Sequence, residues 1–191
     1  MFTNPNKFKG KYRTQSNRLA GYNYSQEGAY FVTICCKDRE CLFGEIVDKK
    51  MVLNELGRIA EECWKNIPDH FPNTKLDKFV IMPNHIHGII FLSSNNNNPS
   101  TNVETKNFLS LRGGQCPHPG TSQTIGSIIR GFKIGVTKWA RQNTDVFVVW
   151  QPNYYDRIVR DEGELNRIRE YILNNPLKWE SDKNNPENIF I

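Results

Sequence analysis

Two histidines, His85 and His87, stand one residue apart within the apolar segment IMPNHIHGII, residues 81–90. In a β-strand successive side chains point to opposite faces, so these imidazoles project together while Ile86 projects the other way. Two imidazoles on one face can bind a metal ion or a phosphate, or can simply be satisfied by hydrogen-bond partners inside a fold. The pattern marks a candidate site and leaves its ligand open.

A tyrosine and an asparagine share one side of the last predicted helix, ELNRIREYILNN, which Pro176 ends. Tyr171 and Asn175 are four residues apart and therefore neighbours on a helix surface, beside its apolar stripe. Both could face one site. A tyrosine in such a position most often packs at the edge of a core, and Tyr154 and Tyr155 compete with it for any chemical role.

A second predicted helix, TIGSIIRGFKIGVTKWARQ at residues 124–142, carries a basic side. At about 100° per residue its apolar side chains fall on one face, which would pack on a sheet, and its basic side chains fall on the other. A basic stripe suits phosphates, although a solvated face is the ordinary alternative. The stripe consists of Arg130, Lys133, Lys138 and Arg141.

These segments belong to a series of predicted elements in the order strand, helix, strand, strand, helix, strand, helix. The predicted sheet strands lie at 29–36, 75–82, 85–92 and 145–151, with a hairpin at 41–54 and a first helix opened by Asn54. The first six elements match the ferredoxin-like βαββαβ arrangement of an α+β protein, an antiparallel sheet with two helices on one face. Its first and third strands are central neighbours, so the histidines lie mid-sheet on the face that the final helix covers.

The length of 191 residues suits one domain with a proper core. A basic stretch without periodicity predicts an N-terminal arm over residues 1–27. The folded domain is expected over 28–180 and contains a flexible Asn/Ser/Gly/Pro-rich loop at 93–123. A C-terminal tail follows at 181–191.

Charge and cysteine content narrow the partners and the compartment. The chain has 25 Lys and Arg against 20 Asp and Glu, a net charge of +5, which mildly favours an anionic partner. It offers no apolar stretch near the roughly 20 residues that span a bilayer and no signal-peptide core, so we expect a cytoplasmic protein without a membrane partner. The cysteine pattern predicts reduced thiols, with a zinc site at Cys116 and His118 as the alternative.

The motifs together resemble a known family. FVIMPNHIHGII, the helix-borne tyrosine of REYILNNP and the segment YFVTICCKDRECLFG resemble the single-tyrosine HUH transposases, and most closely the REP-associated tyrosine transposases. The resemblance spans roughly residues 28 to 180 and implies a ferredoxin-like catalytic domain that binds a DNA hairpin and cleaves an adjacent single strand. It implies that His85 and His87 are metal ligands, that Tyr171 is the nucleophile and that Asn175 is a further ligand.

The implied chemistry is strand transfer. Two imidazoles and an amide oxygen leave positions open on Mg²⁺ or Mn²⁺ for a scissile phosphate. A phosphotyrosine ester conserves the energy of the broken bond, so the same site can rejoin single-stranded, hairpin-containing DNA. The chain would act as a monomer or a homodimer. The alternatives are a hairpin DNA- or RNA-binding module of the same fold without chemistry, and a metal-dependent nuclease that uses water.

Overall fold

The protein is built around one four-stranded antiparallel sheet. A computed structural model describes residues 23–93, 123–182 and 184–188, and its main sheet has the strand order β4-β5-β1-β6. The central strands are therefore the first and third sheet strands of the chain, which confirms the predicted ferredoxin-like α+β fold. The four strands are β1 (Gly28–Cys35), β4 (Thr74–Ile81), β5 (His85–Leu92) and β6 (Tyr155–Val159).

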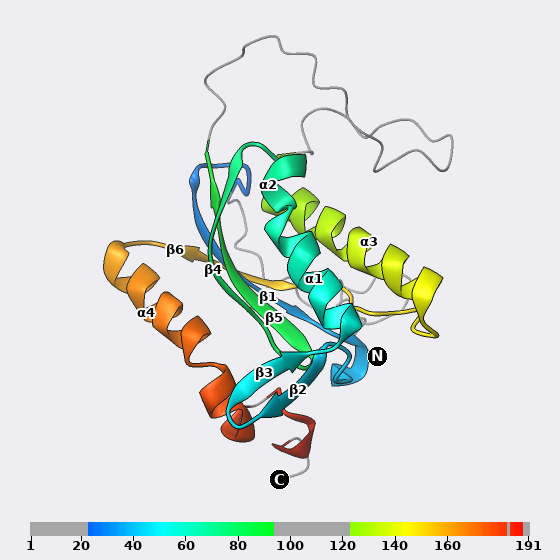
Figure 1. Cartoon of the computed structure of the whole chain (residues 1–191). Coiled ribbons are helices and arrows are strands. Elements are labelled where there is room, and N and C mark those ends of the chain that lie inside the picture. The colour runs from blue at the N-terminus through cyan, green and yellow to red at the C-terminus, as the bar shows by residue number, and fades with distance from the viewer. Residues whose placement is uncertain (1–22, 94–122, 183, 189–191) are drawn as a thin grey trace, which may run out of the picture.

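Helices cover both faces of the sheet (Figure 1). Helices α1 (Glu55–Lys65) and α3 (Ile125–Asn143) lie on one face, and α4 (Glu162–Leu173) lies on the other. The two helices on one face begin where capping residues predict. The Asn54 side chain accepts from Gly57 N at 2.8 Å, and the Thr124 side chain accepts from Ser127 N at 3.2 Å.

Shorter elements join these layers. The predicted hairpin is present as β2 (Gly44–Val47) and β3 (Lys50–Leu53), and the remaining pieces are α2 (Ile67–His70), η2 (Lys37–Arg39), η3 (Pro176–Ser181) and η4 (Pro186–Asn188). No helix of the described residues is long and apolar enough to cross a membrane. Residues 94–122 of the predicted loop, with Cys116 and His118, and residues 1–22 of the predicted arm lie outside the described residues.

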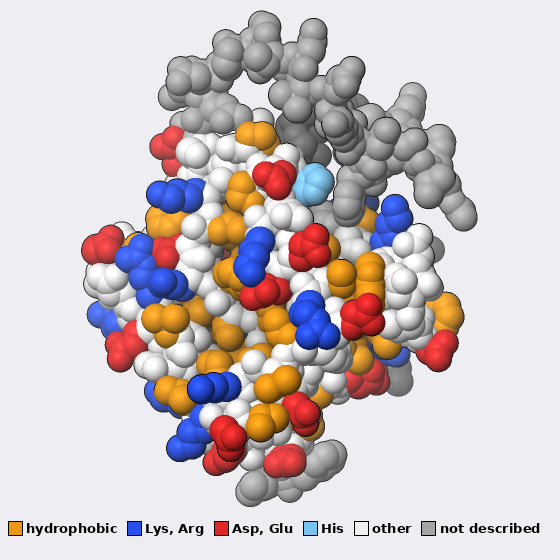
Figure 2. All heavy atoms as spheres, in the orientation of Figure 1, with side chains coloured by type: hydrophobic (Ala, Val, Ile, Leu, Met, Phe, Trp, Pro, Cys, Tyr) orange, Lys and Arg blue, Asp and Glu red, His pale blue; other side chains and the backbone are white. Residues whose placement is uncertain are grey.

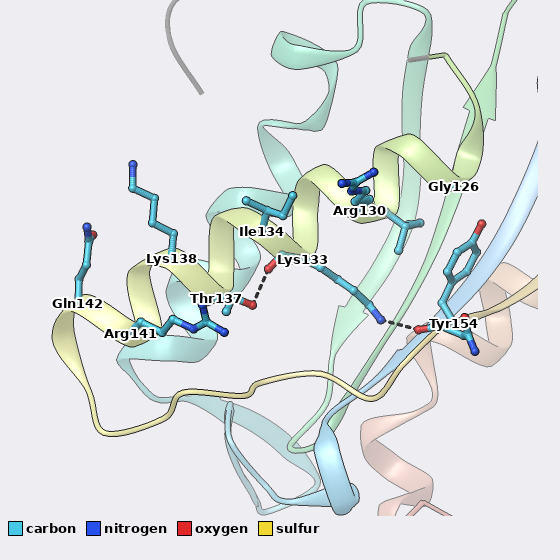
Figure 3. Close-up of a pocket in the computed structure, with 11 residues that line it drawn as sticks. Gly126, Arg130, Lys133, Ile134, Thr137, Lys138, Arg141, Gln142 and Tyr154 are labelled. Atoms are coloured by element: carbon cyan, nitrogen blue, oxygen red, sulfur yellow. Dashed lines mark hydrogen bonds between the residues drawn. The ribbon is translucent and has the colours of Figure 1, made fainter. Parts of the chain in front are cut away.

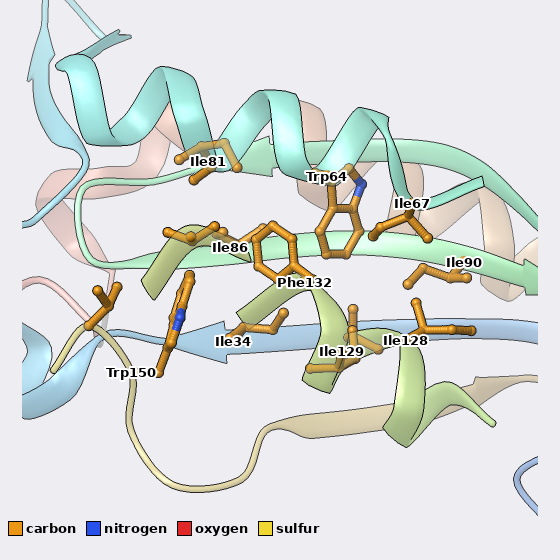
Figure 4. Packing of buried hydrophobic residues seen from close by; sticks show 14 of the residues in the cluster. Ile34, Trp64, Ile67, Ile81, Ile86, Ile90, Ile128, Ile129, Phe132 and Trp150 are labelled. Carbon is orange, nitrogen blue, oxygen red and sulfur yellow. The ribbon is translucent and has the colours of Figure 1, made fainter. Parts of the chain in front are cut away.

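The main core lies between the sheet and the pair α1 and α3 (Figure 4). The indole of Trp64 on α1 is fully buried and meets the Phe132 ring of α3 edge-on, at 5.3 Å between centroids. Trp64 also lies directly on β5, because a Cβ added at Gly88 would stand only 2.2 Å from its ring. Glycine at this position lets the helix approach the strand that carries the histidines.

The predicted last strand at 145–151 is wrong. Phe147 and Val148 are 63% and 50% exposed, and only the end of this segment meets the sheet, through the bridge Cys36–Trp150 and the bond from Gln151 N to Cys35 O at 3.0 Å. The edge of β1 is instead occupied by β6, which follows this segment. The β-branched and aromatic composition of residues 145–151 resembles that of a strand. Pro152 and Asn153, which has a φ of 67°, follow directly, so the pairing with β1 begins only after them.

The contact between Trp64 and Gly88 gives a stability prediction. The substitution Gly88→Ala places a methyl group inside the indole, so it should lower the free energy of unfolding by about 1–3 kcal/mol in urea denaturation. In a Trp64→Phe background the same substitution should cost less, because the smaller ring leaves room. Equal costs in both backgrounds would show that the indole does not set the strand's need for glycine.

Candidate functional site

The two histidines share one face of the sheet, as the sequence predicts. Their ring centroids lie 4.6 Å apart, and the side chains are 0% and 3% exposed for His85 and His87. The neighbouring Ile86 points to the other face, into the core beneath α1 and α3. Ile89 points the same way as the histidines and packs beneath α4. Both imidazoles therefore lie between the sheet and α4.

Each histidine is oriented by a neighbour through its Nδ1 atom. Thr33, which pairs with His87 across β1 and β5, places its Oγ1 2.8 Å from His87 Nδ1. Asn84 places its Oδ1 2.8 Å from His85 Nδ1. The sequence analysis did not find these two residues. Thr33 can be found once the pairing of the two central strands is assumed, but Asn84 looks like an ordinary turn residue after proline.

Tyr171 reaches the histidine pair from α4. Its hydroxyl lies 3.2 Å from His87 Nε2, and the two ring centroids are 5.1 Å apart. The Phe31 ring of β1 meets the Tyr171 ring edge-on, with an interplanar angle of 89°, so the phenol is held in place from the sheet. The side chain is still 40% exposed, which leaves the hydroxyl accessible from solvent. The structure thus brings the predicted tyrosine and histidines together.

An apolar contact and an ion pair fix α4 on the sheet. Leu165, Ile168 and Ile172 of the helix pack with Ala29 and Ile89. Arg169 Nε donates to Asp77 Oδ2 of β4 at 2.8 Å.

A β-bulge in β4 supplies the carboxylate for this ion pair. The register with β5 shifts between Leu76 and Phe79, and both of those side chains pack in the core beneath α1. The extra residue lets Asp77 reach the face that α4 covers, which is a common use of a bulge. The position of Tyr171 therefore depends on an irregularity in a strand on the far side of β5.

Asn175 completes the group of predicted site residues. It follows the end of α4, is 2% exposed, and its side chain hydrogen-bonds the Tyr171 phenol. Its Oδ1 is buried without a hydrogen-bond partner among the described residues. Two imidazoles with an unsatisfied amide oxygen make a donor set that fits a divalent ion. Among the described residues no three His, Cys, Asp or Glu side chains form a metal cluster, so an ion here needs the amide or substrate oxygens as well.

The surroundings of Tyr171 favour the protonated phenol. Burial raises the pKa of Tyr171 above its ordinary value, and the nearby Asp182 carboxylate raises it further. The hydrogen bond with Asn175 acts in the opposite direction. The tyrosine is therefore neutral at physiological pH.

The predicted basic stripe lies on the opposite face of the sheet from the histidines. The apolar side of α3 packs in the main core, as expected, and its outer side lines a groove of about 1030 Å³ (Figure 3). Arg130 and Lys138 point outward, and Arg141 donates from Nε to Phe147 O at 2.9 Å. The stripe and the histidine pair therefore do not form one surface. A DNA ligand that uses both must pass around the sheet.

Lys133 departs from the predicted outward stripe. Its Nζ donates to Gln151 O at 3.0 Å and also to Asn153 O, so the ammonium ties α3 to the segment that leads into β6. Burial lowers the pKa of Lys133 to about 8. The methylenes and the ammonium of Lys133 lie beneath the groove. Helical spacing predicts on which side of α3 a residue lies but not how deeply its side chain is buried, so the sequence did not reveal this position.

The two competing tyrosines lie at the start of β6 and point to opposite faces. Tyr154 lines the groove along α3. Tyr155 pairs with Thr33, so it points to the histidine face, and it is 55% exposed. Tyr155 lies two strands from the His87 strand, whereas Tyr171 contacts His87 directly.

On the face shown in Figure 2 basic and acidic side chains are interspersed. Beside Tyr171 a hollow of about 260 Å³ is lined by two cations that the sequence analysis did not single out, Arg167 and Lys178. Arg167 precedes Tyr171 by one helical turn, and that spacing is the signal that could have identified it.

Comparison with known proteins finds a relative similar enough to belong to one family with this chain. No protein-family profile matches it. A Haemophilus influenzae protein described only as uncharacterized is 53% identical over 174 residues, which cover 91% of this chain and 94% of that protein. A second Haemophilus influenzae protein, named "Putative REP-associated tyrosine transposase", is 23% identical over 156 residues, or 82% of this chain and 74% of that protein.

The fold also has a solved counterpart. The structure of a REP-associated tyrosine transposase bound to a REP hairpin matches with a TM-score of 0.55 at 17% sequence identity, covering 86% of this chain and 74% of that chain. This likeness confirms the fold. Together with the second Haemophilus influenzae protein it confirms the resemblance that the histidine and tyrosine motifs predict.

The charge next to the phenol gives a prediction for the metal-free protein. The substitution Asp182→Asn removes a carboxylate that raises the pKa of Tyr171, so the phenol should ionise at a lower pH than in the wild type. An NMR titration of the tyrosine Cζ carbons measures this, with Tyr171→Phe assigning the resonance. The amide retains an oxygen to accept from Asn184 N, which preserves the local turn. An unchanged or higher pKa would contradict this assignment of the cause.

Proposed function

Because the chain belongs to one family with its uncharacterized Haemophilus influenzae relative and resembles the REP-associated tyrosine transposases, we propose that it cleaves and rejoins single-stranded DNA next to a hairpin. The observation that carries this proposal is the 3.2 Å contact between the Tyr171 hydroxyl and His87 Nε2, on the sheet face that His85 shares. A nucleophile next to a pair of potential metal ligands is the arrangement that phosphoryl transfer to tyrosine needs.

The site would hold a divalent ion through the two imidazoles and Asn175 Oδ1. When bound, such an ion neutralises the charge of a scissile phosphate and polarises it for attack. The chain's own residues supply the rest. Thr33 and Asn84 hold the imidazoles in place, and Phe31 holds the Tyr171 ring at right angles to its own.

The proposed step is a transesterification. The Tyr171 oxygen forms a bond to the phosphorus of a DNA phosphodiester, and the bond from that phosphorus to one deoxyribose oxygen breaks. One ester bond forms as another breaks, so the number of ester bonds is conserved. The phenolic proton passes to solvent or to the departing oxygen. Reversal of the step with a different strand end rejoins DNA, which a water-using nuclease cannot do.

One ring nitrogen serves two purposes in this scheme. His87 Nε2 contacts the Tyr171 hydroxyl, while Nδ1 contacts Thr33. If Nε2 binds the ion, the phenol must leave this nitrogen, which frees its oxygen for the phosphate.

DNA would contact both faces of the sheet. The solved relative holds a REP hairpin, and we assign hairpin binding in this chain to the groove of α3, where Arg130, Lys138 and Arg141 offer cations to phosphates. The start of β6 joins the two faces, since Tyr154 lines the groove and Tyr155 points to the histidine face. An unpaired strand can thus follow this edge to the site, where a second pair of cations, Arg167 and Lys178, lines the hollow beside Tyr171.

The identity of the nucleophile is tested by a conservative substitution. The variant Tyr171→Phe keeps the ring's packing and removes only the oxygen, so it should fold, bind hairpin DNA and form no covalent adduct. The assay is a denaturation-resistant band shift with single-stranded DNA that carries the hairpins flanking the gene, in Mn²⁺. The variant should also bind Mn²⁺ at least as tightly as the wild type, because the phenol no longer competes for His87 Nε2.

Tyr154→Phe and Tyr155→Phe are the matched controls and should both form the adduct. Loss of the adduct in either control, together with its persistence in Tyr171→Phe, would move the chemistry to the start of β6. Cleavage without any adduct in the wild type would favour a nuclease that uses water. Hairpin binding without cleavage would favour a silent binding module.

A second substitution tests the metal ligands. His87→Ala should abolish cleavage while leaving hairpin binding largely intact, because the hairpin groove lies on the other face of the sheet. Wild-type cleavage should be lost in EDTA and restored by Mn²⁺. Undiminished cleavage by the wild type in EDTA would contradict the metal role and leave the histidines as structural residues.

The salt dependence of hairpin binding tests the groove of α3. Alanine at Arg130, Lys138 or Arg141 should each lower the slope of log K against log salt by about one unit or less and weaken unrelated hairpins equally. Lys133→Ala is the control, because two backbone carbonyls already bind its ammonium, and its slope should stay closer to that of the wild type. Unchanged slopes in all the groove variants would make this stripe a solvated surface.

A further inference from the structure

The side chain of Asn84, in the turn between β4 and β5, is buried and uses all of its hydrogen-bonding groups. It is 1% exposed, and its Nδ2 donates to Arg39 O at 2.9 Å and to Asn184 O at 2.7 Å. Its Oδ1 lies 2.8 Å from His85 Nδ1. The backbone of the same residue is also fixed, since its carbonyl accepts from Cys36 N at 2.8 Å.

The two carbonyl partners fix the orientation of this amide. Carbonyl oxygens only accept hydrogen bonds, so the atom that faces Arg39 O and Asn184 O must be the NH₂ group. The reverse orientation would place Oδ1 against two carbonyl oxygens and leave buried acceptors without a donor, which is unfavourable. The oxygen of Asn84 therefore faces the imidazole.

This orientation selects one tautomer of His85. An amide oxygen can only accept, so His85 Nδ1 must carry the hydrogen of the neutral ring, and the lone pair then belongs to Nε2. We propose that Asn84 is a positioning residue that holds His85 as the Nδ1–H tautomer and so presents a buried Nε2 lone pair to a divalent cation. The identity of the cation's site rests on the proposed function, but the tautomer does not.

His87 lacks an equivalent constraint. Its Nδ1 neighbour is the hydroxyl of Thr33 and its Nε2 neighbour is the hydroxyl of Tyr171, and a hydroxyl can either donate or accept. The two histidines thus differ. His85 is prepared for a cation before one arrives, whereas His87 can exchange its hydrogen-bond roles when the phenol departs.

The amide also connects His85 to two distant parts of the chain. Arg39 follows β1, and Asn184 lies 100 residues after Asn84, in the segment that continues from η3. Trp179 of η3 packs near the His85 ring, with centroids 6.1 Å apart. The segment after α4, the helix that carries Tyr171, therefore also supports His85.

The direct test is a long-range ¹H–¹⁵N spectrum of the metal-free protein labelled with ¹⁵N-histidine at neutral pH. Ring nitrogens that carry hydrogen and those that carry a lone pair resonate in separate regions, and the His85 signals are those lost in His85→Gln. We expect His85 to show a protonated Nδ1 and a bare Nε2. A wild-type His85 with its hydrogen on Nε2 overturns the proposal without any variant.

Two substitutions separate the acceptor of Asn84 from its donors. Asn84→Asp keeps an oxygen facing His85 and should keep a hydrogen on Nδ1, whether the ring is neutral or charged, while Asn84→Ala should release the ring into a mixture of tautomers and weaken Mn²⁺ binding about 10- to 100-fold. The matched control is Asn73→Ala, which removes another buried asparagine, 4% exposed, at the opposite end of β4. This control should change neither the tautomer of His85 nor the affinity for Mn²⁺. A folded Asn84→Ala with the wild-type tautomer overturns the proposal, as does an Nδ1 without hydrogen in Asn84→Asp.

These measurements need neither DNA nor cleavage. If the tautomer and Mn²⁺ results hold and no covalent adduct ever forms, the proposed transposase activity fails and the assignment of Asn84 stands. If the adduct forms and His85 carries its hydrogen on Nε2, the assignment of Asn84 fails alone. Should neither variant fold, the wild-type spectrum still decides.

Discussion

The site depends on the strict alternation of side chains along β5. His85 and His87 point to one face, and Ile86, Gly88 and Ile90 point to the other, so a slip of one residue would exchange the site with the core. The indole of Trp64 opposes such a slip, because it occupies the space that a side chain at Gly88 would fill. Packing of α1 on one face of the strand thereby holds the imidazoles in position on the other.

The sheet supplies the histidines, but only α4 supplies the phenol. That helix contributes an apolar stripe, an ion pair and a tyrosine from successive turns. Its apolar residues fill the second face of the sheet, while Arg169 reaches the bulged strand β4 at Asp77. The apolar contacts and the ion pair both join α4 to the sheet, so the packing of the whole domain sets the distance between Tyr171 and His87. The raised pKa of Tyr171 keeps its phenol protonated at physiological pH.

Much of this arrangement could be predicted from the sequence, because the relevant signals are local. The alternation around His85 and His87 and the helix starts at Asn54 and Thr124 depend on neighbours within four residues and formed as expected. Helix α4 carries Tyr171 as predicted but ends at Leu173, so Asn175, which was expected on the helix, follows its end.

What depends on tertiary packing could not be predicted. The segment 145–151 has the composition of a strand, yet the edge of β1 pairs with β6. Lys133 lies on the basic side of α3 by spacing, yet its ammonium turns inward to carbonyls of the chain that returns beneath it. The basic stripe and the histidines lie on opposite faces of the sheet, and which face each occupies follows only from the assembled layers. Asn84 gains its role from Arg39 and Asn184, which local pattern cannot connect to it.

A diffraction experiment on crystals soaked in Mn²⁺ tests the central claim most directly, because the anomalous signal of manganese locates the ion without reference to activity. We predict one strong anomalous peak within coordination distance of His85 Nε2, His87 Nε2 and Asn175 Oδ1, with the Tyr171 hydroxyl moved off His87. Manganese bound elsewhere on the molecule, with the hydrogen bond between Tyr171 and His87 intact, would contradict a metal-assisted tyrosine site on this face of the sheet.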